Sequence, residues 1–225
     1  MSAVGASEVV AVVDYGAGNL RSVANALMRV AGAMSPSPRI VVTAAAETVA
    51  AADRVVLPGV GAFADCMGGL TALAGMRMAL DEAVRDKARP FLGICVGMQL
   101  LASVGREHGD HPGLGWLPGA VVALGVRPGP DGRALKVPHM GWNTLSRCAI
   151  PHPLLDNLAD APDVYFVHSY HFEPDDRRLV LAETEYGGPL AAVVGRDTMV
   201  GTQFHPEKSQ GVGLSILRNF LEWRP

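Results

Sequence analysis

Short apolar runs alternate with segments of helical character along the first hundred residues of the chain. Each run is too short for a helix and predicts a buried strand; the runs lie at residues 8–13, 39–43, 53–57 and 91–94. Residues 20–30 carry apolar side chains along one helical face, and helices are also expected at 44–51 and over most of 62–87. Strands and helices that alternate at this spacing predict βαβ units and a parallel sheet with helices on both faces.

The second half of the chain is less regular and richer in β signals. Residues 105–119 predict a loop, because glycine and proline interrupt them, and residues 121–142 predict short strands around a Pro/Gly turn. Strands return from residue 164, a hairpin is expected at 191–204, and a helix closes the chain. The predicted fold is α/β, with a mostly parallel central sheet flanked by helices and a smaller antiparallel β portion in the second half.

Size and composition narrow the class of protein. A chain of 225 residues can bury a sizeable core, and 8–225 are expected to form a single domain after a disordered tail at 1–7. Lysine and arginine (19) are fewer than aspartate and glutamate (22), and no basic run is present, which argues against nucleic-acid binding. The uncharged stretch at 90–105 is too short and too polar to span a membrane.

The three cysteines have no C-x-x-C spacing, so neither a disulfide framework nor a zinc site is expected. An odd, small number of cysteines is typical of the reducing cytoplasm. The glycine-rich loop at 14–19 superficially suggests a dinucleotide site, but it lacks the third glycine at the required spacing. The sequence therefore predicts no metal and no cofactor.

One cysteine has the surroundings of a nucleophile. Cys95 follows the strand at 91–94 and precedes a second apolar segment with helical spacing, in the pattern Gly-x-Cys-x-Gly. A strand that turns abruptly into a helix strains its pivot residue, and side chains two positions before and after would collide. The thiol would then lie at a helix N-terminus, which favours the thiolate, and the N–H of Val96 would face a developing oxyanion. The alternative is a buried structural cysteine.

A base for this thiol is found in His205-Pro206-Glu207, near the end of the chain. Pro206 favours an extended conformation at His205, and side chains two apart in an extended segment point the same way. Glu207 would then hold one ring nitrogen of His205 and leave the other for Cys95. His205 alone would carry little weight, because the chain has seven histidines.

Together these two motifs resemble the class I (triad) glutamine amidotransferases, through GICVGMQLL (93–101) and FHPEKSQ (204–210). Within that family, DYGAGNL (14–20), PGVGAFADCM (58–67), KVPHMGWN (136–143) and YFVHSYH (165–171) are similar to the glutaminase subunits of imidazole glycerol phosphate synthases. Other members share the cysteine and the His-x-Glu but not these blocks. Val96 stands where leucine is expected, which matters little because only its N–H is used.

The resemblance implies that Cys95 attacks the side-chain amide of glutamine, while His205 transfers protons and Glu207 orients it. It also implies two groups of binding residues: an oxyanion hole from Val60, Gly61 and Val96, and a substrate site from Gly59, Gln99, His168, Ser169 and Tyr170. Glycines on both sides of Val60 would let a peptide flip at low cost. We therefore also expect an oxyanion hole that is incomplete until a partner binds.

The partner implied by the resemblance is a cyclase subunit with a (β/α)₈ barrel, joined in a heterodimer. It would use the ammonia to make imidazole glycerol phosphate and an aminoimidazole carboxamide ribotide, in histidine biosynthesis. Interface residues would be Asn19, Arg21, Pro138, His139, Met140 and Lys208. Asn19 would equally serve as a helix cap, and the glycine- and proline-rich segments as tight turns.

Three other functions fit part of the pattern. A glutaminase serving a different synthase would use the same chemistry with another partner. A regulatory or scaffold subunit would keep the fold without activity, because fold alone never establishes function. A redox-active thiol protein would carry the cysteine at its strained turn but not His205-Pro206-Glu207.

Overall fold

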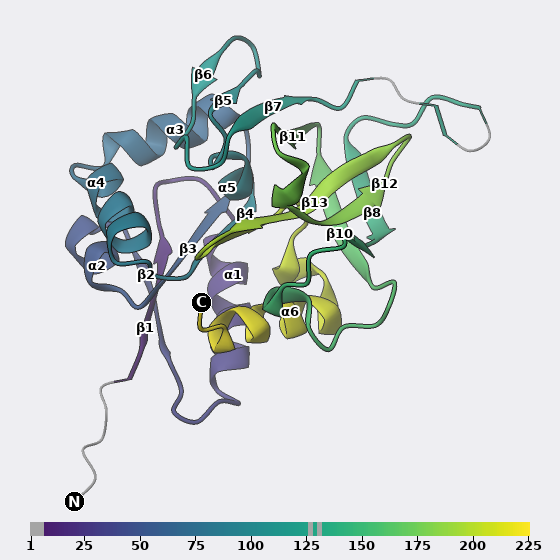
Figure 1. The fold of residues 1–225 in the computed structure, drawn as a ribbon. Helices are drawn as coiled ribbons and strands as arrows, with labels where there is room; N and C mark the ends of the chain where they lie inside the picture. Colours follow the sequence, from purple (N-terminus) through teal and green to yellow (C-terminus); the bar gives the residue numbers. More distant parts are fainter. Residues whose placement is uncertain (1–6, 126–127, 130–131) are drawn as a thin grey trace, which may run out of the picture.

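An eight-stranded sheet forms the centre of the molecule in the computed structural model, which describes residues 7–125, 128–129 and 132–225 (Figure 1). Its strands, in spatial order, are β2 (Arg39–Thr43), β1 (Val9–Val13), β3 (Arg54–Gly59), β4 (Phe91–Cys95), β14 (Met199–Thr202), β13 (Pro189–Arg196), β12 (Val180–Glu185) and β9 (Ser146–Arg147). Strands β2 to β14 in this order are parallel, and the remaining pairs are antiparallel. This arrangement confirms the predicted α/β fold.

Helices cover both faces of the parallel part. Helix α1 (Leu20–Ala31) packs against α6 (Gln210–Glu222), whereas α2 (Ala46–Ala51) packs against α4 (Met76–Asp81). Figure 1 shows the two pairs on either side of the strands. The order of the strands explains this, because right-handed crossovers that move in opposite directions along a sheet place their helices on opposite faces.

Two smaller sheets extend the second half of the chain. Strand β8 (His139–Thr144) pairs with β10 (Asp163–His168), and the other sheet runs β11 (Tyr170–Pro174), β7 (Gly119–Ala123), β5 (Val104–Gly105) and β6 (His111–Pro112). The expectation of a loop throughout 105–119 is therefore wrong. Strands of two residues leave no periodicity in the sequence, so only their pairing reveals them.

The helical stretch at 62–87 is divided into three parts. Helix α3 (Phe63–Ala72) ends before Gly75, whose positive φ of 74° opens α4, and a π-helical turn, Glu82–Asp86, follows. Short 3-10 turns lie at Pro153–Leu155, Arg177–Leu179 and Pro206–Lys208.

Asn19 precedes α1, but its side chain makes no capping hydrogen bond. The proposed role of Asn19 as a side-chain helix cap is therefore wrong. The predicted tail at 1–7 falls largely on residues 1–6, which lie outside the described part of the chain, as do 126–127 and 130–131 of the predicted Pro/Gly turn.

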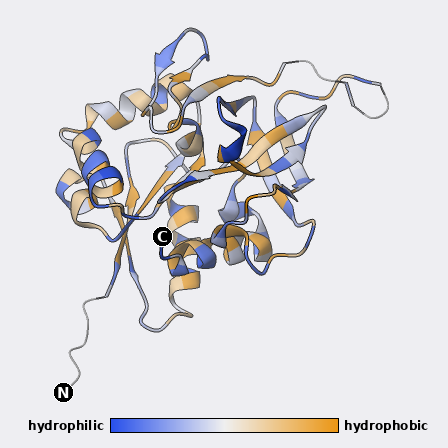
Figure 2. Ribbon diagram, in the orientation of Figure 1, coloured by the Kyte–Doolittle hydropathy of each residue, from blue (hydrophilic) through white to orange (hydrophobic). Residues whose placement is uncertain are grey.

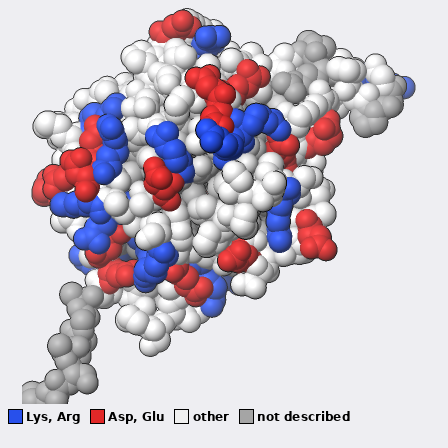
Figure 3. Space-filling view, in the orientation of Figure 1, with Lys and Arg blue, Asp and Glu red and all other residues white. Residues whose placement is uncertain are grey.

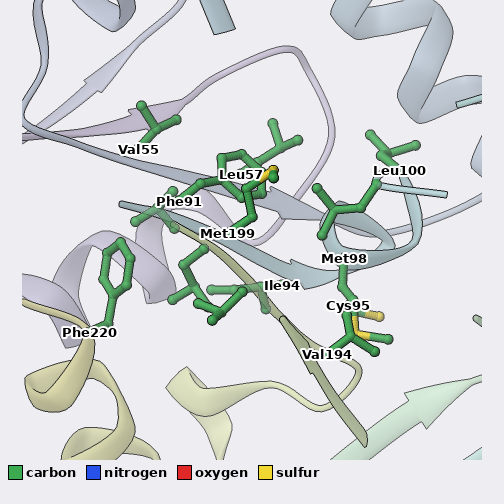
Figure 4. Close-up of a cluster of buried hydrophobic side chains, with 14 of the residues drawn as sticks. Val55, Leu57, Phe91, Ile94, Cys95, Met98, Leu100, Val194, Met199 and Phe220 are labelled. Atoms are coloured by element: carbon green, nitrogen blue, oxygen red, sulfur yellow. The ribbon is translucent and has the colours of Figure 1, made fainter. Parts of the chain in front are cut away.

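The core is continuous through the sheet and both helix layers. Figure 4 shows Val55, Leu57 and Phe91 of β3 and β4 in one cluster with Phe220 of α6, and Met98 near Cys95. Strands β1, β3 and β4 are buried almost throughout, as expected for parallel strands covered on both faces. Figure 2 shows hydrophobic residues along the central strands and on parts of the helices that cover them.

Charged groups are spread over the surface. On the face shown in Figure 3, basic and acidic side chains are interspersed, in keeping with ion pairs such as Arg77–Asp81 at 3.0 Å and Arg177–Glu183 at 2.8 Å. Among the helices of the described residues, none combines the length and the apolar character that a bilayer crossing demands.

Two neighbouring glycines of α3 provide a test of this packing. A Cβ on Gly69 would lie 2.5 Å from the backbone oxygen of Tyr15, whereas a Cβ on Gly68 would meet no atom within 4 Å. We expect Gly69→Ala to lower the free energy of unfolding by about 1–3 kcal/mol through overpacking. Gly68→Ala should raise it by about 0.5–1 kcal/mol, because alanine favours a helix. Urea denaturation measures both, and equal effects of the two substitutions would contradict the packing.

Candidate active site

Cys95 lies at the end of β4 with backbone angles of φ 54° and ψ −111°, the strained conformation that its sequence pattern predicts. The flanking glycines are required by close backbone contacts. A Cβ on Gly93 would lie 2.5 Å from the oxygen of Gly97, and one on Gly97 would lie 1.8 Å from the oxygen of Leu57. Cys95 is therefore held at the strand's end by packing that no larger residues would allow.

The helix after Cys95 is shorter than the sequence suggests. Helix α5 spans only Val96–Gln99, and irregular turns follow it. A single turn aligns few peptide dipoles, so its N-terminus carries less partial positive charge than the longer helix that we expected.

His205 and Glu207 are joined by a hydrogen bond. The Nδ1–H of His205 donates to Oε1 of Glu207 at 2.8 Å, and both side chains are almost fully buried. His205 itself is extended, as predicted from Pro206, but Glu207 lies in a 3-10 turn. The turn, and not an extended segment as we expected, therefore brings the carboxylate back to the ring.

The second ring nitrogen of His205 is placed for proton transfer. Nε2 is buried, and His205 lines the same cavity as Cys95, whose side chain interacts with the ring. Burial lowers the pKa of His205, but the Cys95 and Glu207 side chains outweigh burial and raise it to about 9. The imidazole is thus charged at neutral pH, with its positive charge stabilised between a sulfur and a carboxylate.

A cavity of about 410 Å³ lies over these residues. It gathers most of the predicted site: Val60, Gly61, Cys95, Val96, Gln99, Pro138, His168, Ser169, Tyr170, His205 and Lys208 all line it. Glu207 lies behind His205, and Gly59 is buried in β3, where a Cβ would meet Gly97 and Tyr15. Gly59 does not line the cavity, so the predicted substrate contact through Gly59 stays a prediction.

One wall of this cavity is held by the amide of Gln99. Its Nε2 donates to the Tyr170 oxygen at 2.9 Å and to Oε1 of Gln203 at 3.1 Å. Gln203 in turn approaches Cys95, with 3.7 Å between its Nε2 and Sγ. The amide nitrogen of Gln99 is therefore engaged within the protein, and only its oxygen is left for a ligand.

His168 is also engaged within the protein. Its Nδ1–H donates to the Tyr170 oxygen at 2.9 Å, because a carbonyl can only accept. Nε2 of His168 therefore accepts from Nδ1 of His139, also at 2.9 Å, and Nε2 of His139 accepts from Asn143. Both ring nitrogens of His168 are therefore occupied within the protein, and the expected contact of this residue with the substrate stays a prediction.

The chain of hydrogen bonds is neutral. Burial lowers the pKa of His168 to about 3 and that of His139 to about 4, so neither imidazole is charged at neutral pH. His139 is only 3% exposed and stacks on Phe166 and Tyr186. The expectation of His139 at a partner interface is therefore wrong, because it alternates with Met140 and faces inward on β8.

The outward face of β8 and β10 is apolar. Met140 and Trp142 are 60% and 49% exposed, and Trp142 meets Tyr165 edge-on at 5.9 Å. The amine of Lys208 lies 5.9 Å from the centre of the Tyr165 ring. Of the other predicted interface residues, Arg21 and Pro138 are exposed and Asn19 is half-buried. Trp142 was not identified from the sequence. Trp142 lies two residues after Met140 on the same strand, so both side chains are expected on the same face.

Glu107 was also missed. It is the one acid among the residues that line the cavity, and its Oε2 accepts the backbone N–H of Phe63 at 2.7 Å. Glu107 lies in the glycine-rich stretch that predicted a loop, and nothing local in the sequence marks it. Among the described residues, no three His, Cys, Asp or Glu side chains are grouped as a metal site requires.

Comparisons with known proteins agree with this geometry. The glutamine amidotransferase class-I family matches residues 11–223. The imidazole glycerol phosphate synthase subunit HisH of Rhodospirillum rubrum is 57% identical over 216 residues, covering 96% of this chain and 99% of that protein. The HisH subunits of Rhodopseudomonas palustris and Zymomonas mobilis are each 55% identical, over 96% and 98% of this chain and over 99% and 98% of their own lengths.

Solved structures share the fold at much lower identity. A crystal structure of a glutamine amidotransferase superimposes with a TM-score of 0.68 at 20% identity, covering 95% of this chain and 97% of its own. A glutamine amidotransferase from Thermotoga maritima gives a TM-score of 0.62 at 15% identity, covering 96% of each chain. With the family matching nearly all of the sequence, this chain belongs to the class-I glutamine amidotransferases.

Proposed function

We propose that this protein is the glutaminase subunit of an imidazole glycerol phosphate synthase. It hydrolyses glutamine to glutamate and ammonia and passes the ammonia to a cyclase subunit. The observation that carries the proposal is the cavity in which Cys95 and the hydrogen-bonded pair His205–Glu207 meet. The identity of more than half of the residues to HisH subunits over almost the whole chain supports the choice of synthase.

The attacking species is the thiolate of Cys95, and its partner is the imidazolium form of His205. The sulfur attacks the amide carbon of glutamine, and the N–H of Val96, with an N–H from Val60 or Gly61, stabilises the oxyanion. The C–N bond breaks as Nε2 of His205 gives its proton to the leaving amine, which departs as ammonia. The products of this half are a thioester on Cys95 and a neutral imidazole.

Hydrolysis reverses the roles. Neutral His205 takes a proton from water, and the resulting hydroxide attacks the thioester carbonyl. The C–S bond breaks, the thiolate and imidazolium are restored, and the new carboxylic acid leaves as glutamate after losing its proton to water. Glu207 supports both halves by fixing the Nδ1–H tautomer, so that Nε2 always faces the cavity.

Glu107 is suited to the substrate's amino end. Glutamine carries a positively charged α-amino group, and Glu107 is the acid among the cavity's lining residues. Its Oε2 is held by the Phe63 N–H, which leaves Oε1 for the ammonium. Ser169 and Tyr170, which also line the cavity, complete the site for the rest of the amino-acid end.

The partner is a cyclase subunit with a (β/α)₈ barrel, in a heterodimer. Ammonia is a nucleophile only while unprotonated, so direct transfer to a second active site is an advantage. The exposed face with Met140, Trp142 and Lys208 adjoins the cavity and is apolar enough to dock a partner. The expectation that the oxyanion segment at 59–61 is incomplete until the partner binds stays a prediction, which the rates of glutamine hydrolysis with and without the cyclase test.

The products of the complex are imidazole glycerol phosphate and an aminoimidazole carboxamide ribotide, in histidine biosynthesis. The described residues from 8 onward act as one domain, in keeping with the continuous core that they share. We place the protein in the cytoplasm, where a reducing environment keeps a thiol nucleophile active.

The first test measures glutamine hydrolysis with and without the cognate cyclase, supplied together with its nucleotide ligand. We expect the complex to hydrolyse glutamine faster than the isolated chain. Cys95→Ala should reduce kcat by at least about 10⁴-fold, because it removes the nucleophile. Cys148→Ala, which removes a thiol outside the cavity, is the control.

The two halves of the proposal fail in different ways. Absence of stimulation by the cyclase would overturn the assignment to this synthase and leave a glutaminase that serves another one. Undiminished hydrolysis by Cys95→Ala would overturn the thioester mechanism itself.

The charge on His205 gives a second test. Because its pKa is raised to about 9, the ring should remain protonated from acidic pH up to about pH 9 and lose its proton above that. Cys95→Ala removes one of the groups that favour the charge, so the midpoint should fall by about one unit or more. NMR titration of the ring nitrogens measures both midpoints, and an unchanged midpoint in the variant would contradict the pairing.

Glu107→Gln tests the proposed ammonium site. The amide oxygen of glutamine can still accept from Phe63, so α3 keeps its contact, but the negative charge is lost. We expect the KM for glutamine to rise by about 10–100-fold, with a smaller change in kcat, because a charge-assisted hydrogen bond is lost. Glu185→Gln, away from the cavity, should leave steady-state kinetics unchanged. An unaltered KM in Glu107→Gln would place the ammonium elsewhere.

A further inference from the structure

Two buried side chains outside the proposed triad hold the backbone of the 58–61 segment. The hydroxyl of Tyr15, just after β1, donates to the Pro58 oxygen at 2.6 Å. The thiol of Cys66, on α3, donates to the Val60 oxygen at 3.4 Å. Neither side chain lines the cavity, and both are almost fully buried.

These bonds fix the direction of the neighbouring N–H groups. The described cis peptides lie at 35–36 and 137–138, so the peptides of this segment are trans, and each C=O points opposite to the next N–H. Tyr15 follows β1, on one edge of β3, whereas Gly59 pairs with Cys95 across the other edge. The N–H groups of Gly59 and Gly61 therefore point away from Tyr15 and Cys66.

The 58–61 segment is closely packed at Gly59 and loosely packed at Gly61. A Cβ on Gly59 would lie 2.6 Å from the nitrogen of Gly97 and 2.8 Å from the Tyr15 hydroxyl. Gly61, in contrast, has a positive φ of 96° and would meet nothing within 4 Å, and Val60 is 40% exposed. Beyond Gly59 the segment is loosely packed. The hydrogen bond from Cys66 therefore determines which way the Val60 carbonyl points.

Both donors keep their hydrogens under ordinary conditions. Burial raises the pKa of Cys66 to about 11, even though its contact with Tyr15 opposes this. Burial also raises the pKa of Tyr15 well above its usual range. The thiol and the hydroxyl thus act as hydrogen-bond donors throughout the neutral range.

We propose that Cys66, supported by Tyr15, is a positioning residue that keeps the Val60 carbonyl turned away from Cys95 and the following N–H available to the oxyanion. The inference rests on the proposed glutaminase function. If the Val60–Gly61 peptide turned over, its oxygen would take the place of the N–H, and a lone pair would face the developing negative charge. Loss of the thiol removes the hydrogen bond that opposes this rotation.

The test compares Cys66→Ala, Cys66→Ser and Tyr15→Phe in the complex with the cyclase. Cys66→Ala should lower kcat by about ten-fold or more, because an oxyanion donor is lost for part of the time, with KM within about two-fold of the wild type. Cys66→Ser restores a donor at the same position and should recover part of the loss. Cys148→Ala is the control for thiol removal and should match the wild type.

A second measurement separates positioning from general damage. The γ-aldehyde analogue of glutamine forms a hemithioacetal with Cys95 that places an oxygen in the hole, whereas alkylation by iodoacetamide needs only the thiolate. Cys66→Ala should weaken the aldehyde's binding about as much as it lowers kcat and leave the alkylation rate unchanged. Thermal unfolding confirms that each variant is folded.

Each outcome bears on the inference. Unchanged kcat and aldehyde affinity in Cys66→Ala would overturn it, while hydrolysis by the wild-type complex would leave the proposed function intact. A parallel loss of alkylation and glutamine binding would show a merely structural role and would also overturn it. A wild-type complex without glutaminase activity would instead refute the proposed function.

Discussion

The strained backbone at Cys95 is the constraint on which the rest of the site depends. A positive φ at a non-glycine residue persists only where the surroundings enforce it. Here Gly97 packs directly onto the Leu57 carbonyl, and Gly93 onto Gly97, so β3, β4 and α5 approach more closely than any side chain at these two positions would permit. The buried core that joins these elements stabilises the strained turn. Because α5 is a single turn, packing rather than a helix dipole determines where the sulfur lies.

Around the cavity, buried side-chain donors hold backbone carbonyls in place. On one side Tyr15 and Cys66 bind the carbonyls of Pro58 and Val60. On the other, Gln99 and His168 converge on the carbonyl of Tyr170. Side chains that a motif comparison assigns to the substrate therefore act on the main chain. The orientation of these backbone groups then depends both on side chains that line the cavity, Gln99 and His168, and on Tyr15 and Cys66 behind it.

The local parts of this site could be predicted from the sequence, and the long-range parts could not. The turn at Cys95 and the pair His205–Glu207 depend on residues two positions apart, which a linear pattern records. Alternating strands and helices likewise gave the parallel sheet. Glu107 depends on how β5 and β6 fold over α3, and the roles of His139 and His168 depend on the register of β8 against β10. Such pairings join residues far apart in sequence and leave no periodicity in either segment.

The three imidazoles near the cavity differ in charge because their surroundings shift their pKa values in opposite directions. His139, His168 and His205 are all buried, and burial alone lowers the pKa of each. His205 differs because Glu207 and Cys95 compensate its charge, whereas His168 has only a carbonyl and a second imidazole as partners. A charged His168 would repel the proton on His205, since the two interact electrostatically. Between about pH 4 and pH 9 His205 is therefore the one of these three rings that is positively charged, and the neutral pair beside it preserves that state.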